Sequence, residues 1–384
     1  MALSIIFARE RKLIKTVLLS TVFISFSSHA VDFEALRQIY SQPSHLWPKA
    51  NLDESVSAKE LGLLPKVVFP KKNPFEANKF TLGKRLFHDG ELSRSKQIAC
   101  ASCHDRDLGW GDGKSTSFGH NRQRGRRNAP TIENVAFGDT FFWDGRAKTL
   151  EQQALMPIQD PLEMNFTLPE LEMRLAQQPD YVALFKSAYG NEEITSEKIA
   201  MALATYQRTL TSRLSKFDRF LLASKQKTEK LQGIYRSAMS DNAIWGMHLF
   251  RTKARCMNCH YGPTLSDQKF HNLGLTYYKR EYQDLGRYQK TKIPSDVGKF
   301  KTPGLRGVLN TKPWMHNGLF GDLTGLLSFY NAGGVQIKRD KLDPLSPETS
   351  TLLKPLSLTN KEVSALIEFL EAVTAPPALG ASSR

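Results

Sequence analysis

Two short motifs in the sequence combine cysteine and histidine at a spacing that suits metalloporphyrin chemistry. They read Cys100-Ala-Ser-Cys103-His104 and Cys256-Met-Asn-Cys259-His260, and they use all four cysteines of the chain. Thiols three residues apart on one helical turn can reach both vinyl groups of a haem, while the following histidine places its imidazole on the iron. C-x-x-C-H is the attachment signature of c-type haem. The sequence therefore predicts two covalently bound haems, with His104 and His260 as proximal ligands.

A zinc site made from two C-x-x-C pairs is the main alternative for these cysteines. Such pairs normally lie within about 15–20 residues of each other, whereas Cys103 and Cys256 are far apart in this chain. With only nine histidines in 384 residues, a histidine directly after both pairs is also improbable by chance. The same argument disfavours two ordinary disulfides.

Helices are expected to position the two motifs. Apolar residues recur at helical spacing over 199–210 and 363–370. Thr359 and Glu362 form a capping box before the second of these segments, and Pro376-Pro377 ends it. Strand-like alternation is scarce, so the sequence predicts a mainly α fold.

The first 30 residues have the composition of a removable secretory signal. Four basic residues between Arg9 and Lys15 precede an apolar run over 16–26, and Ala30 ends a small-residue cleavage site. The run is shorter than the ~20 residues that a membrane span needs. We therefore expect a periplasmic protein without stable membrane insertion after signal removal. Losing four positive charges and one negative charge takes its net charge from +15 to +12.

Two widely separated motifs in about 350 mature residues suggest one haem per domain. The polar stretch 224–230 is the candidate boundary, and a helix that includes Ile244 and Phe250 opens the second domain. The Pro- and Lys-rich segment 51–78 is expected to wrap the surface. The predicted organisation is a signal peptide (1–30), an N-terminal extension (31–78), an N-terminal haem domain (79–225) and a C-terminal haem domain (226–384).

Four further segments carry a family resemblance. They are Leu82-Gly-Lys-Arg-Leu-Phe-His-Asp89, Arg127-Asn-Ala-Pro-Thr131, Phe142-Trp-Asp-Gly-Arg-Ala147 and Pro313-Trp-Met-His-Asn-Gly318. With them, the chain from about Leu82 to Val373 resembles the bacterial dihaem cytochrome c peroxidase and MauG family. The resemblance implies two cytochrome c-like helical domains with a calcium site at their interface. It also implies reaction of peroxide at the N-terminal haem and electron storage or entry at the C-terminal haem.

The resemblance assigns further residues to the first site. Ser117-Phe-Gly-His120 is similar to the peroxidase loop whose histidine binds the resting first haem and leaves when the other haem is reduced. His120 is therefore a candidate gate, with a solvated loop histidine as the alternative. MauG-type members lack this ligand.

Three residues in a ten-residue register match the catalytic residues of the family. Glu163 matches the acid–base residue, Gln153 the distal glutamine and Trp143 the tryptophan between the haems. Cleavage of peroxide needs a group that takes up and returns a proton, and a carboxylate in a partly dry pocket suits that task. A solvated glutamate and a tryptophan that only packs in the core are the alternatives.

The predicted calcium site also follows from the resemblance. Asn128 would supply a side-chain oxygen, and Thr311 and Pro313 would supply backbone carbonyls. Oxygen ligands are those that a hard cation prefers, and waters would complete the shell. The alternative is that Asn128 only caps a turn.

The second site departs from the cytochrome c peroxidase pattern. There a methionine seventeen residues after the calcium-ligating proline binds the iron, and the same position here is Tyr330. This is similar to the MauG arrangement. A phenolate stabilises oxidised iron, whereas a thioether raises the potential. Met315 is the competing ligand, and His316 is expected near a haem propionate.

These features predict a periplasmic dihaem c-type peroxidase of the MauG kind. It would reduce hydrogen peroxide at the N-terminal haem and oxidise a protein or redox partner through the C-terminal haem. One alternative is a conventional cytochrome c peroxidase that detoxifies peroxide with electrons from a small c-type cytochrome. The other is a non-catalytic dihaem electron carrier, which would need neither an acid–base residue nor an accessible iron.

The basic run from Arg122 to Arg127 gives a prediction about the partner. Such a run would steer an acidic protein toward it in a salt-dependent way. A solvated loop is the alternative, and nucleic acid is not expected as a partner of an exported haem protein.

Overall fold

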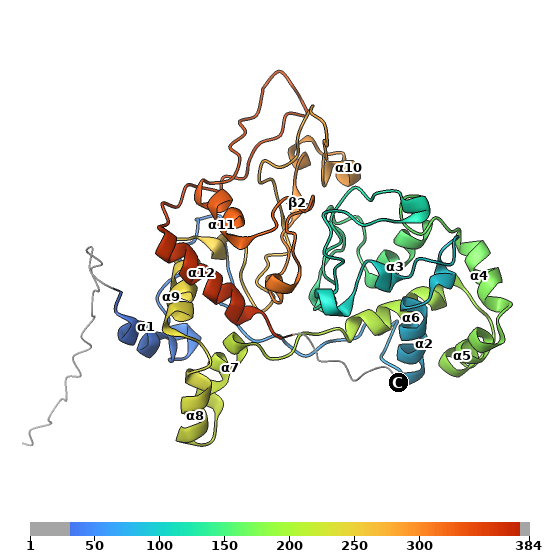
Figure 1. Ribbon diagram of the computed structural model, residues 1–384, viewed down its shortest axis with the longest axis horizontal. Coiled ribbons are helices and arrows are strands. Elements are labelled where there is room, and N and C mark those ends of the chain that lie inside the picture. The colour runs from blue at the N-terminus through green and yellow to red at the C-terminus, as the bar shows by residue number, and fades with distance from the viewer. Residues whose placement is uncertain (1–30, 377–384) are drawn as a thin grey trace, which may run out of the picture. The chain divides into compact units, whose positions relative to one another are not determined.

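Helices dominate residues 31–376, the part of the chain that the computed structural model describes. The mainly α prediction is confirmed, while the predicted signal segment 1–30 lies outside the described residues. Two short antiparallel strands pair Phe270 with Lys301 and His271 with Phe300. In chain order the elements are α1 (Phe33–Tyr40), α2 (Ala77–Phe87), α3 (Leu150–Gln159), α4 (Leu168–Ala176), α5 (Pro179–Tyr189), α6 (Ser196–Arg208), α7 (Lys216–Leu222), α8 (Glu229–Arg236), α9 (Asp241–Arg251), β1 (Phe270–His271), α10 (Tyr288–Thr291), β2 (Phe300–Lys301), α11 (Leu323–Asn331) and α12 (Asn360–Val373) (Figure 1).

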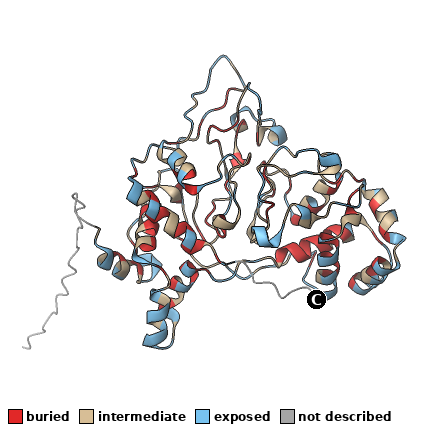
Figure 2. Ribbon diagram, in the orientation of Figure 1, coloured by how far each residue is buried: buried red, intermediate tan, exposed pale blue. Residues whose placement is uncertain are grey.

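Helix α6 is the centre of one group of packed helices. The Thr195 side chain caps it by accepting a hydrogen bond from Lys198 N, and the predicted apolar position Leu203 is fully buried. Helices α2 and α3 pack against α6, which is mostly buried (Figure 2). At the crossing with α2, a Cβ on Gly83 would lie 2.0 Å from Ala202 O. This close approach therefore requires glycine.

Helices α9 and α12 make a matching crossing in a second group. Helix α12 is the segment predicted over 363–370, and its capping box joins Thr359 to Glu362 as expected. A Cβ on Gly246 of α9 would lie 1.9 Å from Ala365 O of α12. Both groups therefore depend on a helix crossing that only a glycine permits.

The N-terminal extension is tied to the second group. Helix α1 packs along α9, and Asn51 N donates a hydrogen bond to Arg251 O at 2.8 Å. Farther along, Gly62 O accepts a hydrogen bond from the Arg306 guanidinium at 2.6 Å. Residues 51–76 contain no helix or strand. Their backbone nevertheless forms hydrogen bonds to Arg251 and Arg306. The prediction of a segment that wraps the surface did not include these contacts.

The polar stretch 224–230, the candidate domain boundary, connects the end of α7 to the start of α8. Helix α7 precedes this stretch but packs against α12 of the second group. The division into haem domains 79–225 and 226–384 stays a prediction. Within residues 31–376, no helix combines the length and apolar character that crossing a bilayer requires.

Candidate active site

The first motif, Cys100–His104, forms a tight turn that fixes its histidine. His104 N donates to Cys100 O at 3.0 Å, and the imidazole Nδ1 bonds to Trp110 O at 3.0 Å. Since a backbone carbonyl only accepts, Nδ1 carries the hydrogen and Nε2 keeps its lone pair. Burial lowers the pKa of His104, which favours the neutral, metal-ligating form. The motif therefore presents a ligand nitrogen as predicted.

The second motif, Cys256–His260, repeats this geometry. His260 N donates to Cys256 O at 2.8 Å, and His260 Nδ1 bonds to Leu265 O at 2.9 Å. Burial again lowers the pKa of the histidine. All four cysteines are free thiols, as covalent attachment to a haem requires. Two independent segments thus offer the same set of donors.

Glu163 lies beside the first motif, although sixty residues separate them. Burial raises the pKa of the Cys100 and Cys103 thiols, and the Glu163 carboxylate is close enough to add to the rise in both. Ser117 forms a hydrogen bond with Cys103, and His120 N donates to Glu163 O at 2.7 Å. The predicted acid–base residue and the predicted gate loop therefore meet at this motif.

The environment of Glu163 suits proton transfer near neutral pH. Burial raises the pKa of its carboxyl to about 7, Asp160 adds to the rise, and Arg146 opposes it. Glu163 lies in the turn after α3, where Glu163 N donates to Asp160 O at 3.0 Å. A carboxyl with a pKa close to the working pH can both accept and return a proton.

Two buried polar atoms of the predicted site residues have no partner. Among the described residues, neither Nδ1 of His120 nor Oε1 of Gln153 forms a hydrogen bond. An unpaired buried polar atom costs about 1–3 kcal/mol. Gln153 comes from α3, and His120 from the short helix His120–Arg122. An iron ligand at His120 and a polar substrate at Gln153 would satisfy these atoms, so the residues present fit a haem site.

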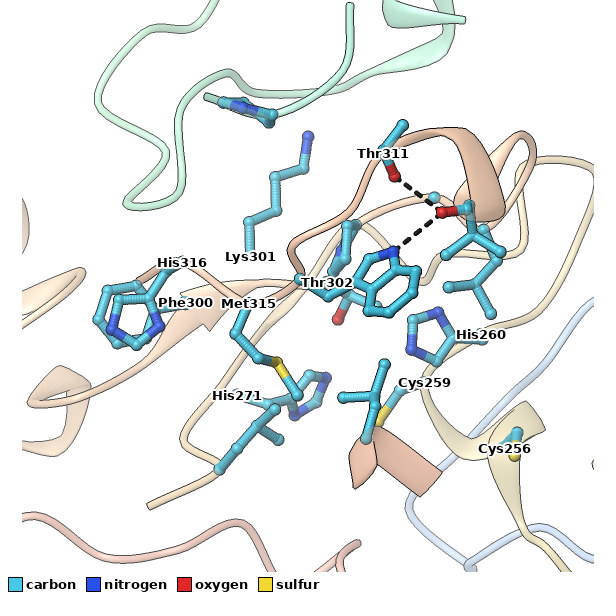
Figure 3. A pocket seen from close by; sticks show the side chains of 18 of the residues that line it. Cys256, Cys259, His260, His271, Phe300, Lys301, Thr302, Thr311, Met315 and His316 are labelled. Atoms are coloured by element: carbon cyan, nitrogen blue, oxygen red, sulfur yellow. Dashed lines mark hydrogen bonds between the residues drawn. The ribbon is translucent and has the colours of Figure 1, made fainter. Parts of the chain in front are cut away.

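A cavity of about 350 Å³ opens at the second motif. Cys256, Cys259 and His260 line it, and both predicted candidates for the sixth ligand reach it. Figure 3 shows Met315 directed into the space that Cys259 and His260 border. The cavity provides an apolar enclosure with few polar groups, which is typical of a cofactor site.

Tyr330 and Met315 approach this cavity from different elements. Tyr330 lies at the end of α11, where burial raises its pKa above the ordinary value and Cys259 and Cys256 add to the rise. A phenolate at this position therefore needs a compensating cation such as iron. Met315 follows β2 in a loop and has a φ of +75°, a strained conformation for this residue type.

Trp143 connects the two halves of the site. Its indole Nε1 donates to Asn128 O at 2.9 Å, and its backbone carbonyl accepts from Lys301 N at 2.8 Å. The Trp143 ring also lies 6.4 Å, edge to face, from the His316 ring, which stacks on Phe300 at 3.5 Å. Trp143 thus contacts Asn128 of its own segment, Lys301 of β2 and His316.

The predicted calcium ligands lie around the same cavity. Asn128, Thr311 and Pro313 all line it, and Asn128 N donates to His316 O at 2.7 Å. The side-chain nitrogen of Asn128 donates to Lys114 O at 2.8 Å, which leaves its amide oxygen as the atom for a cation. Residues from two distant segments therefore line one cavity, and the calcium site stays a prediction.

Arg127 does not belong to the exposed basic run. Its guanidinium bonds to Asp144 at 2.7 Å and to both carboxylate oxygens of Asp284 at 2.7 and 2.8 Å. Arg122, Arg124 and Arg126 are exposed. The predicted basic surface is therefore smaller than the sequence run, and Arg127 instead joins two segments next to Asn128.

Sequence reasoning missed two further contacts near the motifs. The ion pair between Arg127 and Asp284 joins residues 157 positions apart. The Lys301 ammonium donates to Thr140 O. In Figure 3 its side chain extends toward the segment drawn in green. Burial lowers the pKa of Lys301 to about 8. No local pattern in the sequence indicates either contact.

Comparisons with known proteins show similarity over most of the chain. A family described as di-haem cytochrome c peroxidase matches residues 77–227. The chain is 38% identical over 343 residues to the cytochrome-c peroxidase IdrP1 of Denitromonas iodatirespirans, covering 82% of this chain and 86% of that protein. It is 38% identical over 315 residues to the methylamine utilization protein MauG of Methylorubrum extorquens, covering 81% and 82%. A solved MauG-like protein associated with microbial copper homeostasis matches with a TM-score of 0.69 and 30% identity, covering 81% of this chain and 95% of that one.

Proposed function

The chain belongs to the di-haem cytochrome c peroxidase family and is a dihaem peroxidase. From that premise we propose that its two haem sites have the separate roles of a MauG-like enzyme. Hydrogen peroxide reacts at the first motif, and a protein or redox partner is oxidised through the second. Cys100, Cys103 and His104 hold one haem, and Cys256, Cys259 and His260 hold the other. The haems supply the iron that exchanges electrons with peroxide and partner. Export to the periplasm, inferred from residues 1–30, is part of the proposal.

Tyr330 is the single observation that carries the MauG-like assignment. It lines the cavity at the second motif, where a conventional cytochrome c peroxidase is expected to have methionine. A buried tyrosine next to a ferric iron gives up its proton to become an anionic ligand, because the iron charge offsets the cost of burying a phenolate. Such a ligand favours the oxidised state and suits a site that stores an oxidising equivalent.

Glu163 performs the proton transfer at the first motif. Its carboxylate accepts a proton from the peroxide oxygen nearer the iron and returns it to the departing oxygen. The pKa of about 7 places both protonation states within reach at neutral pH. Gln153, whose Oε1 has no partner among the described residues, orients the substrate by accepting a hydrogen bond.

The calcium ion stays part of this proposal. It would bind the Asn128 side-chain oxygen and the carbonyls of Thr311 and Pro313, with waters as the other ligands. The support is that these residues line one cavity and that Asn128 N bonds to His316 O. The ion would then fix the segment whose backbone holds the Trp143 indole. Removal with a chelator should abolish activity, and added calcium should restore it.

A conventional cytochrome c peroxidase is the second candidate because of His120. This histidine lies in the loop bonded to Glu163 O, and its Nδ1 is buried without a partner among residues 31–376. If His120 binds the resting iron, peroxide reacts only after the second haem has been reduced. The donor would then be a small reduced c-type cytochrome.

Optical and EPR spectra of the ferric protein, before and after one equivalent of peroxide, test the two candidates. The MauG-like proposal expects one high-spin haem, one low-spin haem that changes in Tyr330→Phe, and a reaction with peroxide without prior reduction. Met315→Leu is the matched control, and it should leave the low-spin signal unchanged.

The opposite results favour the second candidate. Two low-spin haems that are indifferent to Tyr330→Phe, with peroxide reactivity only after half-reduction, would reject the MauG-like assignment. His120→Ala should then convert one haem to high spin and remove the need for reduction.

A further inference from the structure

A buried group of aromatic and charged side chains lies outside both motifs, between the N-terminal extension and α9. Tyr40, the last residue of α1, is 1% exposed, and Trp47 is 7% exposed. His248 and Arg251 of α9 pack against them, and Glu60 completes the group. We name these five residues the Tyr40 cluster.

The hydrogen bonds of the cluster set the direction of the Tyr40 proton. The Tyr40 hydroxyl lies 2.9 Å from Nδ1 of His248, and the Arg251 guanidinium donates to the same hydroxyl oxygen at 3.0 Å. Burial, together with the positive charge of Arg251, lowers the pKa of His248 to about 4. The imidazole is therefore neutral. Because Arg251 only donates, the phenolic hydrogen is the one that points at Nδ1 of His248.

Trp47 extends the cluster toward the surface. Its ring lies 5.2 Å from the Tyr40 ring in an edge-to-face arrangement, and Arg251 lies over it at 5.2 Å. The next residue toward the N-terminus, Leu46, is 58% exposed. The Arg251 charge is balanced by Glu60, which accepts two hydrogen bonds from it. Two oxidisable rings thus adjoin in a neutralised, water-poor environment.

The cluster also adjoins the second motif. Phe250 and Ala254 line the cavity there, and they flank Arg251 in the sequence. Asn51 N, four residues after Trp47, donates to Arg251 O. One turn at the end of α9 therefore separates the cavity from the cluster.

We propose that Tyr40 is a redox-active tyrosine, which gives one electron toward the second motif and its phenolic proton to Nδ1 of His248. This rests on the peroxide reaction proposed above, since hydrogen peroxide is the oxidant. Peroxide takes up two electrons and two solvent protons to give two waters; Tyr40 supplies one of these electrons, and the other comes from a bound ferric haem. The products at the cluster are a neutral tyrosyl radical and a protonated His248. Trp47 then gives an electron to the Tyr40 radical while protonated His248 returns the proton to the phenolic oxygen, which leaves Trp47 as the oxidised residue, next to exposed Leu46.

Freeze-quench EPR after one equivalent of peroxide tests this inference. The wild type should give a tyrosyl radical signal that falls to baseline in Tyr40→Phe, with haem content and peroxide consumption preserved. Tyr189→Phe is the matched control, because its hydroxyl donates to Lys198 O at 2.6 Å and a backbone carbonyl cannot take up the proton. The signal should persist in that variant. An unchanged signal in Tyr40→Phe, or no organic radical in a wild type that consumes peroxide, overturns the inference but leaves the proposed function intact. No consumption of peroxide overturns the proposed function instead.

Two further measurements serve if Tyr40→Phe does not fold. His248→Gln keeps a hydrogen-bond acceptor but removes the base, so the radical signal should be lost. A full signal in this variant would reject the proton transfer. Peptide mapping of the wild type after repeated turnover needs no variant, and it should find oxidised Tyr40 or Trp47 ahead of Tyr189. Oxidation confined to other peptides would reject the relay.

Discussion

The two motifs hold their histidines alike but secure their turns differently. His104 bonds to a carbonyl six residues later and His260 to one five residues later. In the first motif, Ser102 closes its own turn by accepting a hydrogen bond from Ala99 N at 3.0 Å. The equivalent residue of the second motif, Asn258, accepts from Asp53 N at 2.7 Å and donates to Asn51 O at 3.0 Å.

This difference separates a locally closed site from one that depends on a distant segment. The hydrogen bonds that close the turn of the first motif come from nearby residues, Ala99–Ser102 and His104–Trp110. The second motif is covered by an extension about 200 residues earlier in the chain, which also carries Tyr40. Closing so long a loop costs entropy that only specific contacts repay. The turn of the first motif is therefore held by its own neighbours, whereas the turn of the second motif also depends on the N-terminal extension.

The largest expected effect concerns the chemistry of the first site. Glu163→Gln keeps the shape of the side chain but removes the proton acceptor, so the rate of peroxide turnover should fall by about 10²–10⁴-fold. Haem content and the spectra of the second site should not change. The measurement is steady-state peroxide consumption at saturating reductant.

Glu170→Gln is the control for that substitution. Glu170 lies in the same part of the chain and pairs with Arg94 at 2.9 Å, away from the first motif. Its variant should turn over at the wild-type rate. Full activity of Glu163→Gln would mean that the acid–base residue lies elsewhere.

The pH dependence of the peroxide reaction should follow the same carboxyl. Glu163 must be deprotonated to accept the first proton, and burial raises its pKa to about 7. The reactive fraction therefore falls as the pH falls below 7, by about tenfold for each further unit. A plot of log kcat/KM against pH should have a slope of one on the acid side. A flat profile between pH 5 and 7 would contradict this assignment.

The difference between the two turns predicts a difference in stability. Asn258→Ala removes the hydrogen bonds to Asp53 N, Asn51 O and Arg255 O in a residue that is 2% exposed, and should cost about 2–4 kcal/mol. Ser102→Ala, at the same position of the first motif, removes one hydrogen bond of a more exposed residue and should cost about 1 kcal/mol. Denaturant unfolding curves would measure both. Equal losses would mean that the extension does not secure the second motif.

Local sequence patterns predicted the elements whose causes are local. The apolar spacing over 199–210 and the capping box of Thr359 identified α6 and α12, because a helix depends on neighbours three and four residues away. The motifs likewise identified His104 and His260, each of which bonds to a carbonyl five or six residues later. Glu163 was identified from the family resemblance, and the fold places its carboxylate close to Cys100.

Contacts between distant residues could not be predicted from local sequence patterns. The bond from Tyr40 to His248 spans 208 residues and that from Asp53 to Asn258 spans 205. A single tyrosine or asparagine in a polar segment predicts nothing about its partner, because the partner is determined only when the helices pack. For the same reason the burial of Arg127 between Asp144 and Asp284 could not be told from its basic neighbours.

The smallest expected effect concerns the exposed arginines of the first site. Changing Arg122, Arg124 and Arg126 to glutamine should lower kcat/KM for an acidic reduced c-type cytochrome by about three- to tenfold at low salt, and flatten its dependence on ionic strength. The direct reaction with peroxide should not change, since peroxide is uncharged.

Lys225, Lys227 and Lys230 offer the matched control for that loss of charge. They are exposed on the stretch 225–230, which ends in the first turn of α8, so their change to glutamine removes the same net charge from a different surface. If steering depends on the loop beside His120, only the arginine variant should lose the dependence on salt. An equal loss in both would mean that net charge alone attracts the donor. The donor would then have no preferred docking at the loop beside His120, and the proposed exchange of electrons through the second motif would not depend on that loop.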